Sequence, residues 1–393
     1  MAEFGFEEIG EDEIQQAMES GGLAGAAKHI QAYLESLDSV EVNIAITGES
    51  GAGKSSFVNA FRGLEEQDEG AAPTGVVETT MEPKEYPHPK FPNVTIWDLP
   101  GIGTPNFKAD EYLEQVNFQR YDFFIIIASE RFRSSNATLA MKIQEMKKKF
   151  YFVRSKIDDN LRAESRKRGY SEEKTLDQIR QDCVKCLQDH GVKEPLVFLI
   201  SSFDLHLYDF NKLEETLENE LPEHKRHILL LSLPNISLQV LKRKQEALRA
   251  RIWKLAALSC GVAVVPIPGL SVVCDVTILV KELSFYYNTF SLDEESLQSL
   301  AQRVNKPVED LKSVIKSPLA KELSADVVLK LLTKAVGGGL MVVEYWASTF
   351  PIFGSAVAGG ISFGTTYHML KSCLEELGED SCNVLKKAFE TEV

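Results

Sequence analysis

The sequence predicts an α/β fold with a doubly wound, mainly parallel sheet, followed by an all-α region. Apolar, β-branched runs alternate with helical patterns from residue 39 to about 220, whereas helical patterns alone continue from Pro222 onward. A glycine-rich turn directly after the first run is the third observation, because strand, glycine loop and helix follow one another in phosphate-binding sheets. We therefore expect an N-terminal helical segment (1–38), a nucleotide-binding domain (39–220) and a C-terminal helical domain (221–393).

Two segments outside the glycine loop have clear patterns. The N-terminal segment has one apolar stripe at helical spacing, made of Leu23, Ala26, Ala27, Ile30, Leu34 and Leu37. Residues 122–128 (DFFIIIA) form a near-continuous apolar run, as expected for a central strand that is covered on both faces.

The glycine-rich turn is a P-loop in its required setting between a strand and a helix. Its glycines allow several backbone N–H groups to point at one anion, and the helix N-terminus adds its positive dipole end. Lys54 is then placed to reach the outer phosphates, and the Ser55 hydroxyl to hold Mg2+. The phosphate-binding residues are therefore Gly48, Glu49, Ser50, Gly51, Ala52, Gly53, Lys54, Ser55 and Ser56.

A second phosphate-side element follows a short strand that ends at Trp97. The sequence DLPG (98–101) matches the DxxG element of GTPases, in which Asp98 supports the Mg2+ shell and the Gly101 amide meets the γ-phosphate. Upstream, residues 70–80 occupy the position of switch I, where a threonine completes the magnesium coordination. Thr79 and Thr80 are the candidates, and Thr80 is preferred.

The residue after Gly101 bears directly on catalysis. It is Ile102, whereas small signalling GTPases have a glutamine there that orients the attacking water. An isoleucine side chain cannot orient water, so hydrolysis by an isolated domain should be slow unless a partner supplies the missing group. We expect Glu78, an acidic residue of switch I, to make an activating contact beside Lys54 and Thr80; the alternative is an ordinary solvent-facing glutamate.

The base is identified by a loop after another apolar strand. The sequence SKID (155–158) resembles the [N/T]KxD element of GTPases, with Ser155 in place of the usual Asn or Thr. The Asp158 carboxylate can accept two hydrogen bonds from guanine, which adenine cannot offer, and the stem of Lys156 can lie over the ring. Ser201 and Ser202, which follow the strand at 196–200, are the expected fifth contact with the base. GTP and GDP are therefore favoured over adenine nucleotides.

Three features of the helical region leave alternatives open. Residues 255–274 are uncharged and long enough to cross a bilayer, but a Pro-Ile-Pro-Gly turn (266–269) favours a core hairpin over conditional insertion or a true span. Residues 335–370 are glycine-rich and contain one charged residue, Glu344, so they pack in a core or against lipid. A basic helix is either a solvated face or attracts anionic lipid or an acidic partner; its cations are Lys242, Arg243, Lys244, Arg249, Arg251 and Lys254.

The overall charge excludes one class of partner. The net charge is -15 and 44% of the residues are hydrophobic, so the chain can bury large cores but has no global positive field to collect nucleic acid. The six scattered cysteines are typical of a protein in a reducing compartment. The N-terminus is acidic and lacks the apolar stretch of a secretory signal. We expect a cytoplasmic protein and leave open a peripheral association with endoplasmic reticulum, Golgi or vacuole membranes.

Several stretches beyond the P-loop resemble the interferon-inducible immunity-related GTPases. They are GAAPTGVVE (70–78), YPHP (86–89), WDLPGIG (97–103), YDFFIII (121–127) and FYFVR (150–154). Lys54 is typical of the GKS-type members, and residues 351–370 look most like the branch of interferon-inducible GTPase 5. Some family members are myristoylated on a glycine after Met1, whereas this chain has Ala2, so that anchor is not expected.

The resemblance implies a dynamin-like GTPase that acts in cell-autonomous immunity. Such proteins assemble on vacuole membranes around intracellular pathogens, and dimerisation through their GTPase domains stimulates hydrolysis. The alternatives are a monomeric switch that recruits effectors through its helical domain without an immune role, and a P-loop ATPase or kinase, which Asp158 disfavours. The resemblance thus implies GTP and GDP as substrate and product, Mg2+ as cofactor, and a homodimer or higher oligomer.

Overall fold

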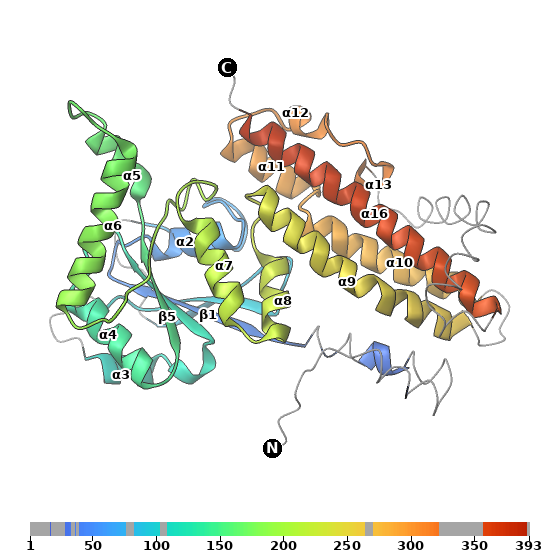
Figure 1. The fold of residues 1–393 in the computed structure, drawn as a ribbon, viewed down its shortest axis with the longest axis horizontal. Coiled ribbons are helices and arrows are strands. Elements are labelled where there is room, and N and C mark those ends of the chain that lie inside the picture. The colour runs from blue at the N-terminus through green and yellow to red at the C-terminus, as the bar shows by residue number, and fades with distance from the viewer. Residues whose placement is uncertain are drawn as a thin grey trace. The chain divides into compact units, whose positions relative to one another are not determined.

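A computed structural model describes residues 16, 28–32, 36, 39–75, 82–102, 108–263, 270–321 and 357–390. The chain forms two compact units: one is Glu41–Ser237, and the other combines Met1–Val40 with Leu238–Val393 (Figure 1). The first unit extends beyond the boundary expected near residue 220, because α8 (Glu223–Ser232) packs against strands β1 (Val42–Gly48) and β3 (Val94–Asp98). In the N-terminal segment, Ile30 is described and is fully buried.

The first unit is built on a doubly wound sheet, as the sequence predicts. Within the described residues, its strand order is β2-β3-β1-β4-β5-β6, and only the edge strand β2 (Lys84–Pro87) is antiparallel to its neighbour. The remaining strands are β4 (Phe123–Ala128), β5 (Lys149–Arg154) and β6 (Val197–Leu199). Strand β1 lies between β3 and β4, so the strand order reverses direction at β1. Ligands bind outside the carboxyl ends of the strands at such a switch point.

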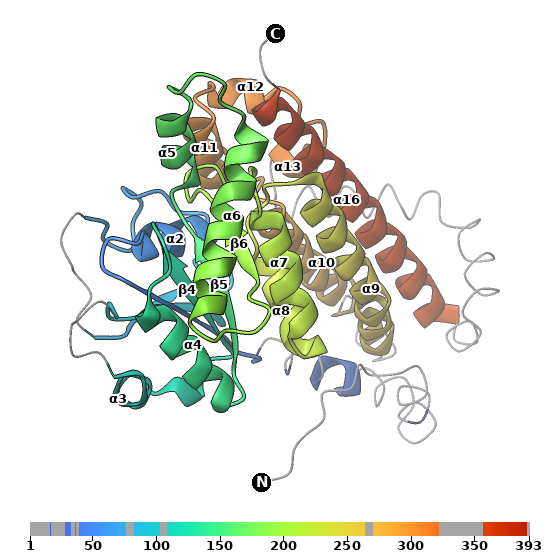
Figure 2. The ribbon, with the colours of Figure 1, turned by 60° about the vertical axis from the view of Figure 1, so that its left-hand side comes forward.

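Helices cover both faces of this sheet. On one face, α4 (Ser134–Glu145) packs on β5 and α6 (Glu172–Asp189) on β6, with α3 (Ala109–Gln115) against α4 and α5 (Ile157–Glu164) against α6 (Figure 2). On the other face, α2 (Lys54–Phe61) packs on β1 and β3, and α7 (Phe210–Glu220) on β6. A short 3-10 helix, η1 (Phe118–Arg120), follows α3.

Alternation along the strands sorts their side chains between these two layers. Ala45, Phe124 and Phe152 belong to a buried cluster that they share with α3, α4 and α6. Ile44 and Ile46 are equally buried but point to the opposite face, since successive strand residues alternate. On that opposite layer, three aromatic rings from α2 and α7 pack together, namely Phe57, Phe61 and Phe210. The sheet is therefore a rigid support for the loops at its edge.

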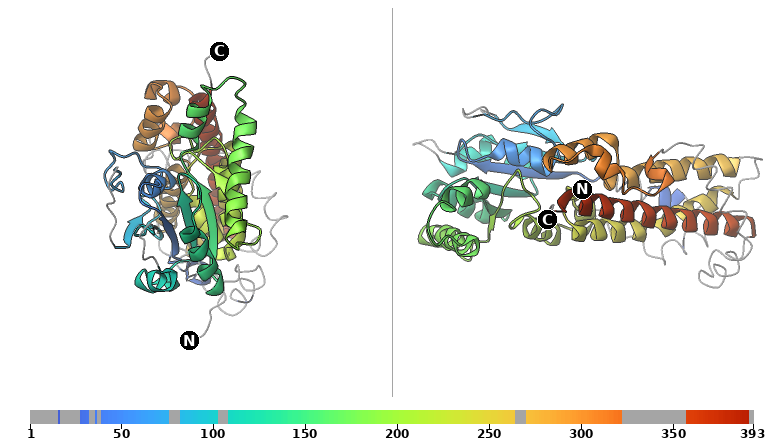
Figure 3. Two further views of the ribbon diagram at one scale, coloured as in Figure 1. Left: turned by 90° about the vertical axis from the view of Figure 1, so that its left-hand side faces the viewer. Right: turned by 90° about the horizontal axis from the view of Figure 1, so that it is seen from above.

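The second unit is helical. Its long helices α9 (Leu238–Ala263), α10 (Leu270–Thr289) and α16 (Val357–Phe389) run alongside one another (Figure 3, right). The shorter helices are α11 (Glu294–Arg303), α12 (Val308–Lys312) and α13 (Pro318–Lys321). The N-cap of α11 is Asp293, whose carboxylate accepts a hydrogen bond of 3.0 Å from the Ser296 N–H.

Two apolar segments were candidates for membrane contact. The helices α9 and α10 pack against each other, but the Pro-Ile-Pro-Gly turn between them and residues 335–356 lie outside the described residues. In the part of the chain that the structure describes, none of the helices combines the length and the hydropathy needed to cross a bilayer.

The basic helix does not present all of its cations on one outer face. Lys244 and Lys254 on α9 are buried, so they form neither a solvated face nor a lipid-attracting one. Arg251 lies 3.4 Å from the buried carboxylate of Glu282, and Arg249 pairs with Glu375 at 2.9 Å. The cations of α9 are therefore divided: Lys244, Lys254 and Arg251 lie inside the helical unit, whereas Lys242 and Arg249 are exposed.

Candidate nucleotide-binding site

The P-loop connects β1 to α2 through backbone conformations that favour glycine. Gly48 has φ 145°, and a Cβ added there would lie 2.1 Å from the Ile127 carbonyl oxygen of β4. Gly53 has φ 86° in the left-handed region and is the N-cap of α2. These two residues let the loop turn tightly enough for the α2 N-terminus to face an anion. Between them, Ser50 and Gly51 are exposed and Ala52 is buried.

Lys54, in the first turn of α2, is held inside the loop. Its side chain is buried, and its ammonium donates hydrogen bonds to the carbonyl oxygens of Glu49 at 3.2 Å and Gly48 at 3.4 Å. Glu49 itself lies 3.4 Å from Arg133 through their charged groups. The cation therefore lies at the end of β1, as the motif predicts, where its charge faces the interior of the loop.

Ser55, in the first turn of α2, and Asp98, at the end of β3, meet directly. The Ser55 hydroxyl donates a hydrogen bond of 2.8 Å to Oδ2 of Asp98, whose side chain is buried at the end of β3. Ser56, next along α2, is half-buried. Two of the three predicted magnesium ligands are thus adjacent.

A tyrosine that the sequence reading missed joins the P-loop strand to the DxxG element. The Tyr112 hydroxyl on α3 shares a hydrogen bond of 2.7 Å with the Thr47 hydroxyl and donates one of 3.0 Å to the Pro100 carbonyl. Burial raises the pKa of Tyr112 well above its usual value, so the phenol remains a neutral donor. Gly101 follows at this point and is half-buried.

Ile102, at the position of the usual glutamine, is fully buried. Its side chain belongs to the apolar cluster under α3 and α4, and its N–H donates to the Gly48 carbonyl at 3.2 Å. Both the residue type and the direction of the side chain therefore exclude it from orienting water at the phosphates.

The predicted base loop is tied to the P-loop by two side chains. The Ser155 hydroxyl donates to the Ala52 carbonyl at 2.7 Å, and the Lys156 ammonium donates to the Gly51 carbonyl at 3.0 Å. Lys156 adopts a left-handed φ of 56° and caps α5, so that Asp158, half-buried, falls in the first turn of that helix. Ser155 thus provides the inter-loop hydrogen bond with its own hydroxyl.

Arg154, the last residue of β5, stabilises this base loop, a role that the sequence analysis did not predict. Its guanidinium donates to the Ser129 carbonyl, to the Ser155 carbonyl at 2.8 Å and to the Asn160 side-chain oxygen at 2.8 Å. Burial lowers the pKa of Arg154, although nearby Cys183 and Glu130 oppose this shift. The residue joins the end of β4, the base loop and α5, and only tertiary structure could reveal this.

Ser201 and Ser202 lie next to the base loop. Strands β5 and β6 are parallel, with Arg154 opposite Leu199, and the Ile157 N–H donates to the Ile200 carbonyl at 3.2 Å. Ser201 is fully buried, and its hydroxyl accepts from the N–H groups of Phe203 and Asp204, both at 3.2 Å. Its hydroxyl therefore stabilises the turn, whereas Ser202 is half-exposed.

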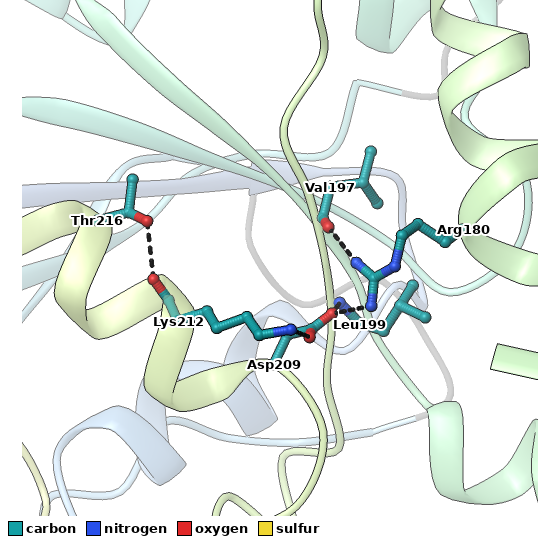
Figure 4. A network of polar contacts seen from close by, with 6 residues as sticks. All are labelled: Arg180, Val197, Leu199, Asp209, Lys212 and Thr216. Carbon is teal, nitrogen blue, oxygen red and sulfur yellow. Dashed lines mark hydrogen bonds and ion pairs between the residues drawn. The ribbon is translucent and has the colours of Figure 1, made fainter. Parts of the chain in front are cut away.

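The far end of this loop is anchored by Asp209 (Figure 4). Its buried carboxylate accepts from the Leu199 N–H at 2.9 Å, from Arg180 at 2.5 Å and from Lys212 at 3.1 Å. Arg180 also donates to the Val197 carbonyl at 2.8 Å. Hydrogen bonds thus fix both ends of the loop between β6 and α7. Nothing in the sequence around Asp209 or Arg180 predicts this role.

The chain before switch I is also anchored. Asn59 exchanges two hydrogen bonds with the backbone of Ala72, at 2.6 and 2.9 Å, and Arg62 donates to the carbonyls of Gly70 and Pro87. The switch residues themselves, Glu78, Thr79 and Thr80, lie outside the described residues. Their roles stay predictions.

Comparison with known proteins gives consistent matches along the chain. The family model described as "Interferon-inducible GTPase (IIGP)" matches residues 7–388. Interferon-inducible GTPase 5 of Bos taurus is 47% identical over 96% of this chain and 82% of its own length. Interferon-gamma-inducible GTPase 10 of Mus musculus is 45% identical over 96% of this chain and 88% of its own length.

A family model matching nearly the whole chain, together with a sheet that carries a P-loop at its switch point, settles the class of the protein. The chain belongs to the interferon-inducible, immunity-related GTPases and is an enzyme that binds and hydrolyses GTP.

Proposed function

We propose that GTP binds across the ends of β1, β3, β5 and β6, with its phosphates on residues 48–56 and its base at Asp158. One observation carries this proposal: the P-loop segment is hydrogen-bonded both to the DxxG element, through Ser55 and Asp98, and to the base loop, through Gly51 and Lys156. In this arrangement Lys54 neutralises the outer phosphates, Gly101 meets the γ-phosphate, and Lys156, Ser201 and Ser202 surround the base.

The same arrangement suits Mg2+. Magnesium prefers oxygen ligands and keeps several of its own waters, and the Ser55 hydroxyl and the Asp98 carboxylate are two such ligands 2.8 Å apart. Thr80 would complete the protein ligands by sequence position. The ion would neutralise negative charge on the β- and γ-phosphates, and the protein residues would hold and orient those phosphates.

Hydrolysis, we propose, is slow in the monomer and faster when two copies meet through their nucleotide-binding faces. The buried side chain of Ile102 supports this, because the chain must obtain a water-orienting or charge-stabilising group from elsewhere. Glu78 in switch I is the proposed activating contact, acting with Lys54 and Thr80. Self-assembly would therefore be part of the catalytic cycle.

The proposed biological role is cell-autonomous innate immunity at pathogen-containing vacuoles or other intracellular membranes. The relatives named interferon-inducible support it. We propose a cytoplasmic protein that associates peripherally with these membranes. Because Lys244 and Lys254 of α9 are buried and few cations of this helix remain at the surface, the attachment would depend on assembled copies adding weak contacts.

The test combines turnover with sedimentation. GTP hydrolysis per molecule is measured over a hundredfold range of protein concentration, and sedimentation is recorded with GTP, GDP and no nucleotide. We expect turnover per molecule to rise with concentration and GTP to increase the sedimentation coefficient. A flat dependence with a monomer in every state would instead support a switch that awaits a separate activating protein.

A further inference from the structure

The loop between β6 and α7 displays two large apolar side chains beside the proposed base site. Phe203 is 57% exposed and Leu207 is 42% exposed, although most apolar side chains of this size in the described residues are buried. The loop is fixed at both ends, by Ser201 and by the Asp209 carboxylate. A fixed loop holds an exposed ring in place at low conformational cost, so this position is suited to contact with a ligand.

The strand register places Phe203 at the same edge as the base loop. Ile157 and Ile200 are joined by a backbone hydrogen bond, so Asp158 and Ser201 each follow directly after this contact. Phe203 is two residues further, and its own N–H is bound by the Ser201 hydroxyl. Burial raises the pKa of the Tyr208 phenol to about 12, and the negative charges of Glu172, Asp158 and Asp204 contribute to this shift, so Asp158 and the neighbour of Phe203 act on the same phenol.

From this placement we infer that the Phe203 ring stacks on the guanine base and forms one wall of its pocket, opposite the stem of Lys156. The inference rests on the proposed position of the base at Asp158. It adds a division of labour: the carboxylate of Asp158 selects guanine by hydrogen bonding, whereas the aromatic ring supplies affinity that is the same for any purine, because every base has a π-face.

Phe203 is favoured over the other exposed apolar side chains because of its position. Leu196 is exposed to almost the same extent, 56%, but it precedes β6 and therefore lies at the opposite edge of the parallel sheet. Leu207 lies later in the loop, near the Asp209 anchor, and lacks a π-face. Leu196 is thus a matched control for exposure without proximity to the base.

The first experiment measures affinity by calorimetry in the full chain. Phe203→Ala should weaken the binding of both GDP and IDP by on the order of tenfold, leaving the ratio of the two affinities unchanged. Phe203→Tyr should retain the affinity of the unsubstituted protein because it keeps the ring, and Leu196→Ala should leave both affinities unchanged. Equal GDP affinity in Phe203→Ala and the unsubstituted protein would overturn the inference.

The second experiment reports the stack directly and does not depend on a loss of binding. In Phe203→Trp, saturating GDP should change the indole fluorescence beyond the background from the three native tryptophans, whereas Leu196→Trp should show only that background. An unchanged Phe203→Trp signal at saturation would overturn the inference, as would a Phe203→Ala variant altered in sedimentation but not in GDP affinity.

The two proposals can fail separately. If the unsubstituted protein binds GDP and Asp158→Ala abolishes its preference over ADP while Phe203→Ala has no effect, the base site stands and the stacking inference is wrong. If Asp158→Ala leaves the base preference unchanged, the proposed base site itself is wrong, and the stacking inference falls with it.

Discussion

Each unit of this protein buries a lysine against backbone carbonyls, and the two lysines have different tasks. Lys54 donates to the carbonyls of Gly48 and Glu49 in the P-loop, whereas Lys244 donates to the carbonyl of Thr289, the last residue of α10, at 3.4 Å. The first lies at a helix N-terminus, where an anion is favoured; the second lies at a helix C-terminus, where the cation itself is favoured. Burial of a lysine therefore does not by itself indicate a binding function. The end of the helix dipole that the lysine faces distinguishes the two cases.

The largest effect is expected from removing the P-loop cation. Lys54→Ala should weaken GTP binding by at least about 4 kcal/mol, because truncating one partner of a desolvated charge pair leaves the phosphates uncompensated. Calorimetry with GTP and GDP checks this value, and circular dichroism confirms that the variant is folded. Near-normal affinity in a folded variant would contradict the proposed phosphate site.

The second prediction concerns the base carboxylate in the same unit. Asp158→Asn should weaken GDP binding by about 3 kcal/mol and improve binding of XDP, since an amide can donate to the second xanthine carbonyl whereas a carboxylate cannot. Competition between the two nucleotides is the measurement. Asp159→Asn, which changes the neighbouring carboxylate that pairs with Arg162, should leave the preference for GDP intact.

The third prediction separates packing from catalysis at Ile102. Ile102→Gln should lower the free energy of unfolding by about 3 kcal/mol, because it places an amide in an apolar cluster, and it should not accelerate hydrolysis at low protein concentration. Ile102→Leu should cost under about 1.5 kcal/mol. Urea unfolding and dilute-protein turnover together check both. Faster turnover at unchanged stability would show that this side chain reaches the phosphates.

The smallest effect is expected from replacing the buried lysine of the helical unit. Lys244→Ala should lower the free energy of unfolding by about 2 kcal/mol through lost packing of its stem and a lost hydrogen bond, without changing GTP affinity. Lys242→Ala, an exposed position on the same helix, should stay within about 0.5 kcal/mol of the parent protein. If Lys244→Ala changed GTP affinity as much as stability, the two lysines would not have separate tasks.

The sequence was informative where function depends on short local patterns. The P-loop, DxxG and SKID elements each occupy a few consecutive residues after a strand, and their strands pair in a doubly wound sheet as predicted. It was uninformative where a role depends on a distant partner. Lys244 meets a carbonyl 45 positions away, and Tyr112 meets Thr47 across 65 positions, so neither role leaves a local signal.

The domain boundary near residue 220 and the outer face of α9 were both inferred from local sequence patterns alone. The domain boundary near 220 took the end of the strand signals as the end of a unit, but α8 buries Leu229 and Leu231 and packs against β1 and β3. The cations of α9 suggested an outer face because periodicity alone does not show which cations have acceptors inside the bundle. In both cases the tertiary neighbour decided the outcome, and propensity did not.

The hydrogen bonds that tie Ser155 and Lys156 to the P-loop have a kinetic consequence. Because the two loops already hold each other, an arriving nucleotide does not have to organise them, and the entropic cost of ordering is met when the chain folds. Association should then be limited by the encounter of nucleotide and site, because these two loops need no rearrangement before they bind it.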